Sequence, residues 1–152
     1  MAITLEPIGR VVGGRADVID DDWSDIRAVI ELDSRFDADA LAGLDAFSHL
    51  LVVYHFDRVD QAKIESCARH PRNNPAWPKV GIFAQRGKNR PNRLGVSTCR
   101  ILGVDGRKVR VQGLDAVDGT PILDVKPVMR GFEPRGEIRE PAWAGEIMAG
   151  YW

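Results

Sequence analysis

Glycine and proline divide this chain into short segments, and their spacing limits what it can fold into. The 15 Gly and 9 Pro residues lie between runs that favour β-structure. Such spacing is typical of many strands joined by tight connections. We therefore predict a mainly β protein: a single antiparallel β-barrel, closed or nearly closed, of about six or seven strands with short helical additions.

Individual runs predict the strands of this barrel. The expected strands span residues 4–12, 27–32, 50–56, 95–104, 108–113 and 121–125. Residues 50–56 are apolar almost throughout, which predicts a strand buried on both faces. Asp105-Gly106-Arg107 separates two of the strands, and an Asp-Gly pair in such a place is typical of a tight hairpin.

Two short helices are predicted outside the strands. Residues 37–44 favour a helix with Asp37 as its N-cap. Residues 141–152 favour a second helix with Pro141 in its first turn, which places Trp143, Ile147 and Tyr151 on one stripe. Because this stripe is rich in aromatic side chains, we expect the segment to pack on the barrel or on a second subunit.

Length and composition limit the organisation and the location of the protein. A chain of 152 residues with 44% hydrophobic residues is enough for one domain with its own core, so we predict a single domain over residues 1–152. No apolar run approaches the about 20 residues that a membrane helix needs, and residues 1–6 lack the basic start and apolar core of a signal peptide. We expect a soluble, cytoplasmic protein with no membrane segment.

The remaining polar motifs exclude several kinds of site. Cys67 and Cys99 match no metal or redox spacing, which predicts free thiols and no metal site. The sequence has no GxGxxG after a strand, no P-loop, no HExxH and no GxSxG. His49 and His55 fall on one face of the expected strand 50–56 and its approach, where a hydrogen-bonded structural role is an alternative to a catalytic one. His70 lies in a basic loop.

Positive charge gathers in one part of the chain. Residues 69–93 hold seven cations and no Asp or Glu, whereas the rest carries 14 positive and 22 negative side chains, a balance of −8. The cations are Arg69, Arg72, Lys79, Arg86, Lys88, Arg90 and Arg93. This asymmetry predicts a dipolar molecule with one cationic loop region that can orient an anionic partner such as RNA.

Residues 81–96 combine these cations with residues that fix the path of a loop. Arg86 and Arg90 can grip a carboxylate or a phosphate with forked hydrogen bonds. Pro91 and Gly95 constrain the backbone between and after them, and Asn92 can hold a turn. A solvated cationic loop is the alternative interpretation.

This segment resembles the FATRSPxRPNPIGLS signature of the tRNA N6-threonylcarbamoyladenosine methyltransferase family, which are β-barrel enzymes that use S-adenosylmethionine. Three further motifs agree in the same order, so that the resemblance covers nearly the whole chain. They are Pro7-Ile8-Gly9, Phe47-Ser48-His49-Leu50 leading into Tyr54-His55-Phe56, and residues 114–127 around Asp118-Gly119-Thr120-Pro121.

The resemblance implies an S-adenosylmethionine pocket completed across a homodimer interface. The donor-contacting residues that it implies are Asp22, Trp23, His55, Phe56, Arg86, Val96, Asp118, Gly119, Thr120 and Pro121. Asp22 and Trp23 match by position only, and packing of the first loop onto the barrel is an equal alternative for Trp23. Arg86 can bind the methionyl carboxylate, and Asp118 can accept from the ribose or the amino group.

The resemblance also implies the reaction and the partner. Methyl transfer to N6 of threonylcarbamoyladenosine, next to the anticodon of tRNA, is an in-line displacement in which alignment supplies much of the rate. The acceptor nitrogen is a poor nucleophile until its proton leaves, so His55 and Asp118 are candidate general bases. Lys88, Arg90, Asn92 and Arg93 are the candidate tRNA-binding residues.

Departures from the family pattern keep two other functions open. The usual Thr-Arg-Ser-Pro is Gln85-Arg86-Gly87-Lys88 here, and the second proline after the asparagine is Arg93. Longer bacterial members also carry an additional C-terminal domain. The alternatives are an S-adenosylmethionine-dependent methyltransferase of another RNA or a small molecule, and a non-catalytic RNA-binding barrel.

Overall fold

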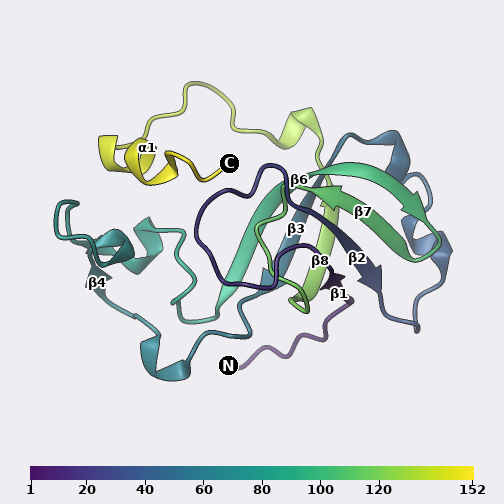
Figure 1. The fold of residues 1–152 in the computed structure, drawn as a ribbon, viewed down its shortest axis with the longest axis horizontal. Helices are drawn as coiled ribbons and strands as arrows, with labels where there is room; N and C mark the ends of the chain where they lie inside the picture. The colour runs from purple at the N-terminus through teal and green to yellow at the C-terminus, as the bar shows by residue number, and fades with distance from the viewer.

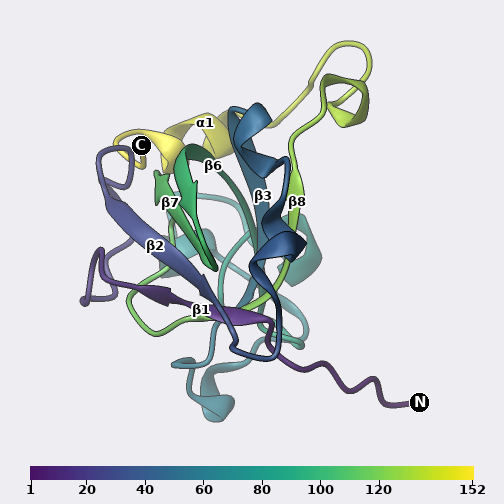
Figure 2. The same ribbon diagram turned by 90° about the vertical axis from the view of Figure 1, so that its right-hand side faces the viewer.

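Six antiparallel strands close into a barrel in the computed structural model, which describes all residues 1–152 (Figures 1 and 2). The order around the barrel is β1-β2-β7-β6-β3-β8. The strands are β1 (Gly9–Val12), β2 (Arg27–Leu32), β3 (His49–His55), β6 (Leu94–Asp105), β7 (Lys108–Gln112) and β8 (Pro121–Pro127). The prediction of a mainly β antiparallel barrel is confirmed.

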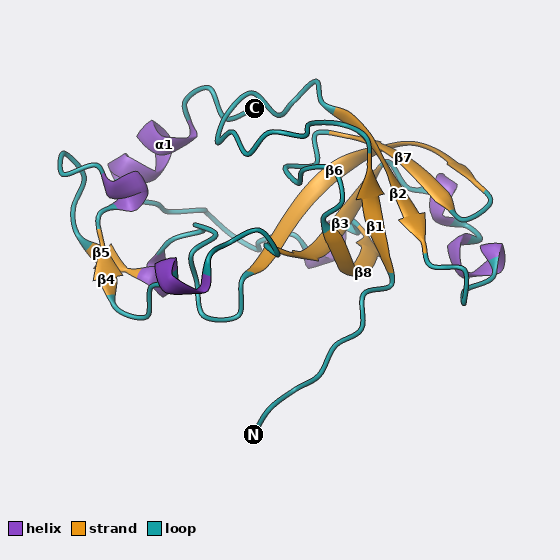
Figure 3. Ribbon diagram, turned by 60° about the horizontal axis from the view of Figure 1, so that its bottom comes forward, coloured by secondary structure: helices purple, strands orange, loops and turns teal.

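Smaller elements lie outside the barrel. The long connection from β3 to β6 contains a two-stranded ribbon of β4 (Ala68–Arg69) and β5 (Val80–Gly81). The single α-helix, α1 (Ala142–Met148), lies on the same side of the barrel as this ribbon (Figure 3). Short 3-10 turns cover Ala38–Leu41, Leu44–Ala46, Gln61–Lys63, Pro71–Asn73, Ile82–Ala84 and Arg130–Phe132. None of the helices is long and apolar enough to span a membrane.

The barrel interior is filled by aliphatic side chains from alternate strand positions. The fully or almost fully buried ones are Val11, Ile30, Leu50, Val52, Val109, Val111 and Ile122. Burying each such side chain contributes about 1.5–3 kcal/mol to folding. The register shifts where β3 meets β8 and where β6 meets β7. Such irregularities bend strands and help a sheet to close.

The expectation that the third strand is buried on both faces is wrong. Along β3, Leu50, Val52 and Tyr54 are buried, but Leu51 and Val53 between them are only half-buried. Alternate residues of a barrel strand point outward. His49 and His55 lie on the outer face of this strand, as predicted.

Two further predictions change: the first strand and the first helix. The first strand begins at Gly9 rather than Thr4, because its partner β2 ends opposite Gly9 at Leu32, and the preceding residues leave the barrel (Figure 3). The helix expected over 37–44 is two 3-10 turns separated by Gly43, which has φ 86°. Asp37 precedes the first turn but makes no side-chain capping bond.

The predicted hairpin is present, but the second predicted helix is shorter than expected: α1 ends at Met148, so Tyr151 lies beyond it rather than on its stripe. Asp105 pairs with Lys108 across the β6–β7 hairpin, and Gly106 takes the positive φ of 58° that the tight turn needs. α1 starts at Ala142 with Pro141 as its N-cap and therefore outside the first turn. Trp143, Ile147 and Tyr151 are each half-buried, and Tyr151 contacts the barrel connection after β7.

The two cysteines differ in accessibility, which predicts selective labelling. Both thiols are free; Cys67 is exposed and Cys99 is buried inside β6. Burial, followed by the negative charge of Asp115, raises the pKa of Cys99 to about 12. At pH 8 we expect an aromatic disulfide reagent to modify one thiol per folded chain and two after unfolding in urea, because the thiolate is the reacting form.

Cys67→Ser is the control for this labelling, and it should leave the folded protein unreactive. Rapid modification of two thiols per folded chain would contradict the buried placement of Cys99.

Candidate functional site

The residues predicted to contact the methyl donor, S-adenosylmethionine, gather at one end of the barrel. We call this end the loop end, and we call these residues the donor residues. It carries three connections: residues 13–26 after β1, residues 56–93 after β3 and residues 113–120 after β7. In the antiparallel barrel, the last residues of β1, β3 and β7 and the first residues of β2, β6 and β8 meet there. Each of the ten predicted donor residues lies in one of these connections or in the adjoining strand end.

Backbone strain is concentrated at the same end of the barrel. Four residues other than glycine have positive φ: Asp22 (64°), Arg72 (51°), Asn73 (55°) and Arg93 (51°). All four belong to the 13–26 and 56–93 connections. Non-glycine residues in this region persist only where the surrounding contacts hold them, and they are frequent at functional sites.

The turn around Asp118 holds the first connection in place. Asp118 Oδ1 accepts a hydrogen bond from Gly13 N at 2.8 Å, and the Asp118 carbonyl accepts from Arg58 Nη2 at 2.9 Å. Gly119, with φ 85°, donates to the Val11 carbonyl. Oδ2 of the exposed Asp118 carboxylate makes no bond within the chain and is free to accept from a ligand.

Thr120 and Pro121 close this turn against the barrel. The buried Thr120 hydroxyl donates to the Val117 carbonyl at 2.7 Å, and its own carbonyl accepts from Val11 N. Pro121 starts β8 opposite Arg10. The hydroxyl and the carbonyl of Thr120 thus both form hydrogen bonds within the chain. This residue therefore shapes the Asp118 turn rather than presenting these polar atoms to a ligand.

His55 is the one histidine whose ring has no hydrogen-bond partner in the chain. His49 Nδ1 pairs with Ser48 Oγ, and His70 Nδ1 pairs with the Trp77 carbonyl, each at 2.7 Å. His55 is half-buried at the end of β3. Next to it, Phe56 donates its N–H to the Arg93 carbonyl at 2.8 Å. The His55 ring is therefore available to a bound molecule.

Arg86 and Val96 form one unit. Arg86 Nη2 donates to the Val96 carbonyl at 2.6 Å, and both side chains are exposed. This bond fixes the guanidinium beside the start of β6 and leaves its other N–H groups without partners in the chain. An anchored guanidinium with free donors is suited to a bidentate carboxylate contact.

A partly buried cluster that no sequence motif indicates connects these parts. Tyr54 donates to Asp115 Oδ1 at 3.0 Å, and Tyr151 donates to Asp115 Oδ2. Burial, then the Asp115 charge, raises the pKa of both tyrosines, whereas the nearby Arg86 charge lowers it, so both remain protonated donors. The motif over 114–127 contains Asp115, but no local pattern links it to Tyr54 or Tyr151.

Trp23 packs the first connection within the chain, which favours the packing alternative over a contact with S-adenosylmethionine. The indole is only 4% exposed, its Nε1 donates to the Asp20 carbonyl at 3.1 Å, and the Arg15 guanidinium stacks 4.3 Å from the ring centroid. The backbone N–H of Asp22 donates to the Gly150 carbonyl, and that of Trp23 donates to Tyr151. The Asp22 side chain stays exposed.

Two of the predicted tRNA-binding residues also brace their own loop. Arg90 Nη1 donates to the Gln85 carbonyl at 2.9 Å, and Arg93 Nη1 donates to the Val59 carbonyl at 3.3 Å. Asn92 is exposed, and Lys88 is half-buried with no hydrogen bond or ion pair. Counting charges along the sequence could not separate bracing arginines from free cations.

The departures from the family signature pack around Arg69. Gln85 is buried, and its Nε2 donates to the carbonyls of Arg69 and Val80 at 3.0 and 2.9 Å, which joins it to both strands of the β4–β5 ribbon. At Gly87, an added Cβ would lie 3.2 Å from Arg69 Nη2. A residue larger than glycine would therefore displace this guanidinium.

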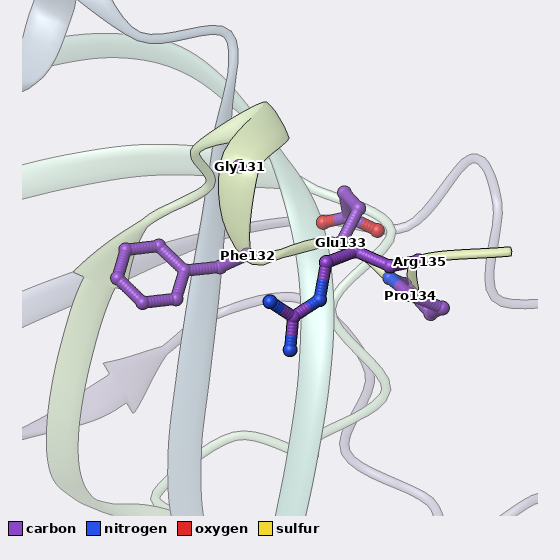
Figure 4. Close-up of a pocket in the computed structure, with 5 residues that line it drawn as sticks. All are labelled: Gly131, Phe132, Glu133, Pro134 and Arg135. Atoms are coloured by element: carbon purple, nitrogen blue, oxygen red, sulfur yellow. The ribbon is translucent and has the colours of Figure 1, made fainter.

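Two hollows of the surface lie away from these residues. One, of about 320 Å³, is formed by the consecutive residues 131–135 (Figure 4). The other, of about 360 Å³, lies beside the β6–β7 hairpin at the opposite end of the barrel. Neither contains a residue predicted to contact S-adenosylmethionine, so the candidate site rests on its convergent polar groups.

The fold and the loop end define a small antiparallel barrel that presents ligand-binding groups from several connections, with a cationic segment beside them. A family model described as the tRNA-methyltransferase O N-terminal domain matches residues 21–133. The chain belongs to this family, which confirms the resemblance found in its motifs.

Individual relatives agree with this assignment. The chain is 35% identical over 115 residues to a "Probable S-adenosyl-L-methionine-binding protein" of Pyrococcus abyssi (76% of this chain, 59% of that protein). It is 31% identical over 102 residues to the human tRNA (adenine(37)-N6)-methyltransferase (67% and 23%). A crystal structure of TrmO from Pseudomonas aeruginosa superposes with a TM-score of 0.73 and 26% identity (91% and 62%). The chain thus spans less than two thirds of each relative.

Gly95 is required by the packing of the cluster, which predicts a stability effect. A Cβ at this position would lie 2.5 Å from Cε2 and Cζ of Tyr54 and 3.0 Å from Phe56 Cζ. Because Tyr54 is buried and hydrogen-bonded, Gly95→Ala should destabilise the fold by about 1–3 kcal/mol, which thermal unfolding would show as a lower Tm.

Gly81→Ala is the matched control for this substitution. Gly81 has φ −60°, and an added Cβ there meets nothing within 4 Å. Equal Tm values for the two variants would show that the space at Gly95 is not limiting.

Proposed function

We propose that this chain is an S-adenosylmethionine-dependent methyltransferase that acts on N6 of threonylcarbamoyladenosine in tRNA, next to the anticodon. The observation that carries the proposal is the anchored Arg86 guanidinium at the loop end. His55, Phe56 and the Asp118 turn lie at the same end of the barrel. Family membership and the names of the human and archaeal relatives support the same activity.

The donor set fits the functional groups of S-adenosylmethionine. The free N–H groups of Arg86 would bind its carboxylate, and Asp118 Oδ2 would accept from its amino group or ribose. The exposed Val96 and the half-buried Phe56 offer apolar contact beside these polar groups. When bound, this cofactor supplies the methyl group.

His55 is the proposed general base. Its ring has no partner in the chain and is therefore free to take the proton from the acceptor nitrogen. Asp118 is the second candidate, although Oδ1 already holds Gly13 N and only Oδ2 is free. We expect most of the remaining rate to come from alignment of donor and acceptor.

The assembly and location are part of the same proposal. We propose a homodimer in which a second copy completes the pocket for S-adenosylmethionine, because the family resemblance implies a shared site. We also propose a cytoplasmic location, where the tRNA substrate is found. Sedimentation that shows only monomer at micromolar concentration would contradict the shared pocket.

Calorimetry and a methylation assay test the function. The chain is titrated with S-adenosylmethionine and then incubated with the donor and tRNA that carries threonylcarbamoyladenosine, and mass spectrometry measures the mass of the modified nucleoside. We expect donor binding and one added methyl group. Donor binding without tRNA methylation would favour another acceptor, and no donor binding would favour a non-catalytic RNA-binding barrel.

A further inference from the structure

The Tyr54–Asp115–Tyr151 cluster lies where the donor-binding segments meet. The Tyr54 ring packs edge to face on Phe56, with 5.3 Å between the centroids, and its edge closes on Gly95. Asp115 belongs to the same 113–120 connection as the Asp118 turn. The cluster therefore contacts both the β3 end and the start of β6.

The segment after α1 joins the same cluster to the first connection. The Gly150 and Tyr151 carbonyls accept from Asp22 N at 3.0 Å and Trp23 N at 2.9 Å, while the Tyr151 hydroxyl donates to Asp115. One residue thus holds the 13–26 connection with its backbone and the 113–120 connection with its side chain. Asp22 keeps its positive φ of 64° within this contact.

Tyr151 also lies outside the part of the chain that defines the family. The family model matches residues 21–133, so it includes Tyr54 and Asp115 but not the segment that supplies the second hydroxyl. The Asp115 carboxylate uses both oxygens on the two tyrosines. Asp115 is therefore suited to holding the two tyrosines in position rather than to contacting a substrate.

We propose that Tyr151 and Asp115 are positioning residues for donor binding: together they hold the 13–26 and 113–120 connections in the arrangement that receives S-adenosylmethionine. This inference rests on the proposed function. It assigns to residues 149–152 a role in the donor site in addition to packing. The Tyr151–Asp115 hydrogen bond therefore affects the affinity for S-adenosylmethionine, whereas it does not alter the groups that touch the reacting atoms.

Tyr151→Phe tests the proposal, because it removes one hydroxyl and keeps the ring. We expect the Kd and the KM for S-adenosylmethionine to rise about 10-fold, since a hydrogen bond to a charged group is lost. The kcat at saturating donor should stay within about twofold. Glu146→Gln is the control: it weakens a contact of the preceding helix α1, in which Trp77 Nε1 donates to Glu146 at 2.7 Å, and should leave the Kd for S-adenosylmethionine unchanged.

A double-mutant cycle and hydrogen exchange separate positioning from general destabilisation. Asp115→Asn and Tyr151→Phe share one contact, so the double variant should weaken donor binding much less than the product of the two single effects. In Tyr151→Phe, the amide protons of Asp22 and Trp23 should exchange faster, whereas that of Val52 in the barrel core should not.

The outcomes distinguish failure of this inference from failure of the proposed function. An unchanged donor Kd in Tyr151→Phe, a fall in kcat alone, or unchanged exchange at Asp22 and Trp23 would overturn the positioning role while methylation by the wild-type chain stands. If the wild-type chain does not bind S-adenosylmethionine, the proposed function fails and this inference fails with it.

Discussion

Replacing Arg86 with alanine will weaken S-adenosylmethionine binding about 10- to 150-fold, because a charge-assisted hydrogen bond to a carboxylate contributes about 1.5–3 kcal/mol. The guanidinium is fixed by its bond to the Val96 carbonyl, so its free N–H groups lose little side-chain entropy when they bind the donor. Calorimetry gives the Kd, and far-ultraviolet circular dichroism should show that the barrel is intact.

Two further variants control this measurement. Arg100→Ala removes the same charge from an exposed position opposite His49 on the barrel wall, and it should leave the donor Kd unchanged. Arg86→Lys keeps the charge but loses the planar fork, so its Kd should fall between those of the wild type and the alanine variant. An Arg86→Ala Kd equal to that of the wild type would remove Arg86 from the donor site.

The barrel could be predicted because its strands and turns are indicated by residues that are close together in the sequence. The spacing of Gly and Pro marks the turns, and Asp105-Gly106 determines one hairpin by its backbone preferences alone. The burial of β3 could not be predicted in this way. A continuous apolar run is compatible with a strand between two layers and with a barrel strand whose outer face is half-covered. Only the three-dimensional arrangement decides between these two cases.

The site could be predicted where a motif keeps its residues together. Arg86 and Val96 are ten residues apart, and both lie in or next to the 81–96 signature. The Tyr54–Asp115–Tyr151 cluster escapes such an analysis because its hydrogen bonds span 61 and 36 residues. The packing of Trp23 could not be predicted for a related reason: the contacts of Trp23 with Arg15 and Tyr151 follow no local pattern in the sequence.

The positive charge of residues 69–93 is a further case in which the sequence does not show which side chains are already engaged within the chain. Seven cations suggest a broad anion-binding face, yet most of the arginines are engaged within the chain: Arg72 pairs with Asp21 at 2.8 Å, and Arg86, Arg90 and Arg93 donate to backbone carbonyls. The side chains of Arg69, Lys79 and Lys88 have no hydrogen bond or ion pair within the chain; because Arg69 Nε is buried, the two lysines are the cations that we expect to meet phosphates. This narrows the predicted tRNA contact to fewer side chains than the sequence indicates.

Replacing Lys79 and Lys88 together with alanine should therefore weaken tRNA binding and flatten its dependence on salt. Each lysine that neutralises a phosphate contributes about 0.7–0.9 to the slope of log affinity against log salt concentration, so the slope should fall by one to two units. Donor affinity should stay the same, because neither lysine belongs to the Arg86–Val96 unit or the Asp118 turn.

The matched control is the pair Lys108→Ala and Lys126→Ala, which removes the same charge from strands β7 and β8. These lysines face Glu31 at 4.0 Å and Asp124 at 3.0 Å on the acidic body of the molecule. If the effect came from net charge alone, both double variants would change the salt slope equally. A slope that responds only to Lys79 and Lys88 requires phosphates at the loop end, where the donor residues lie. A wild-type slope in both variants would instead favour a small-molecule acceptor.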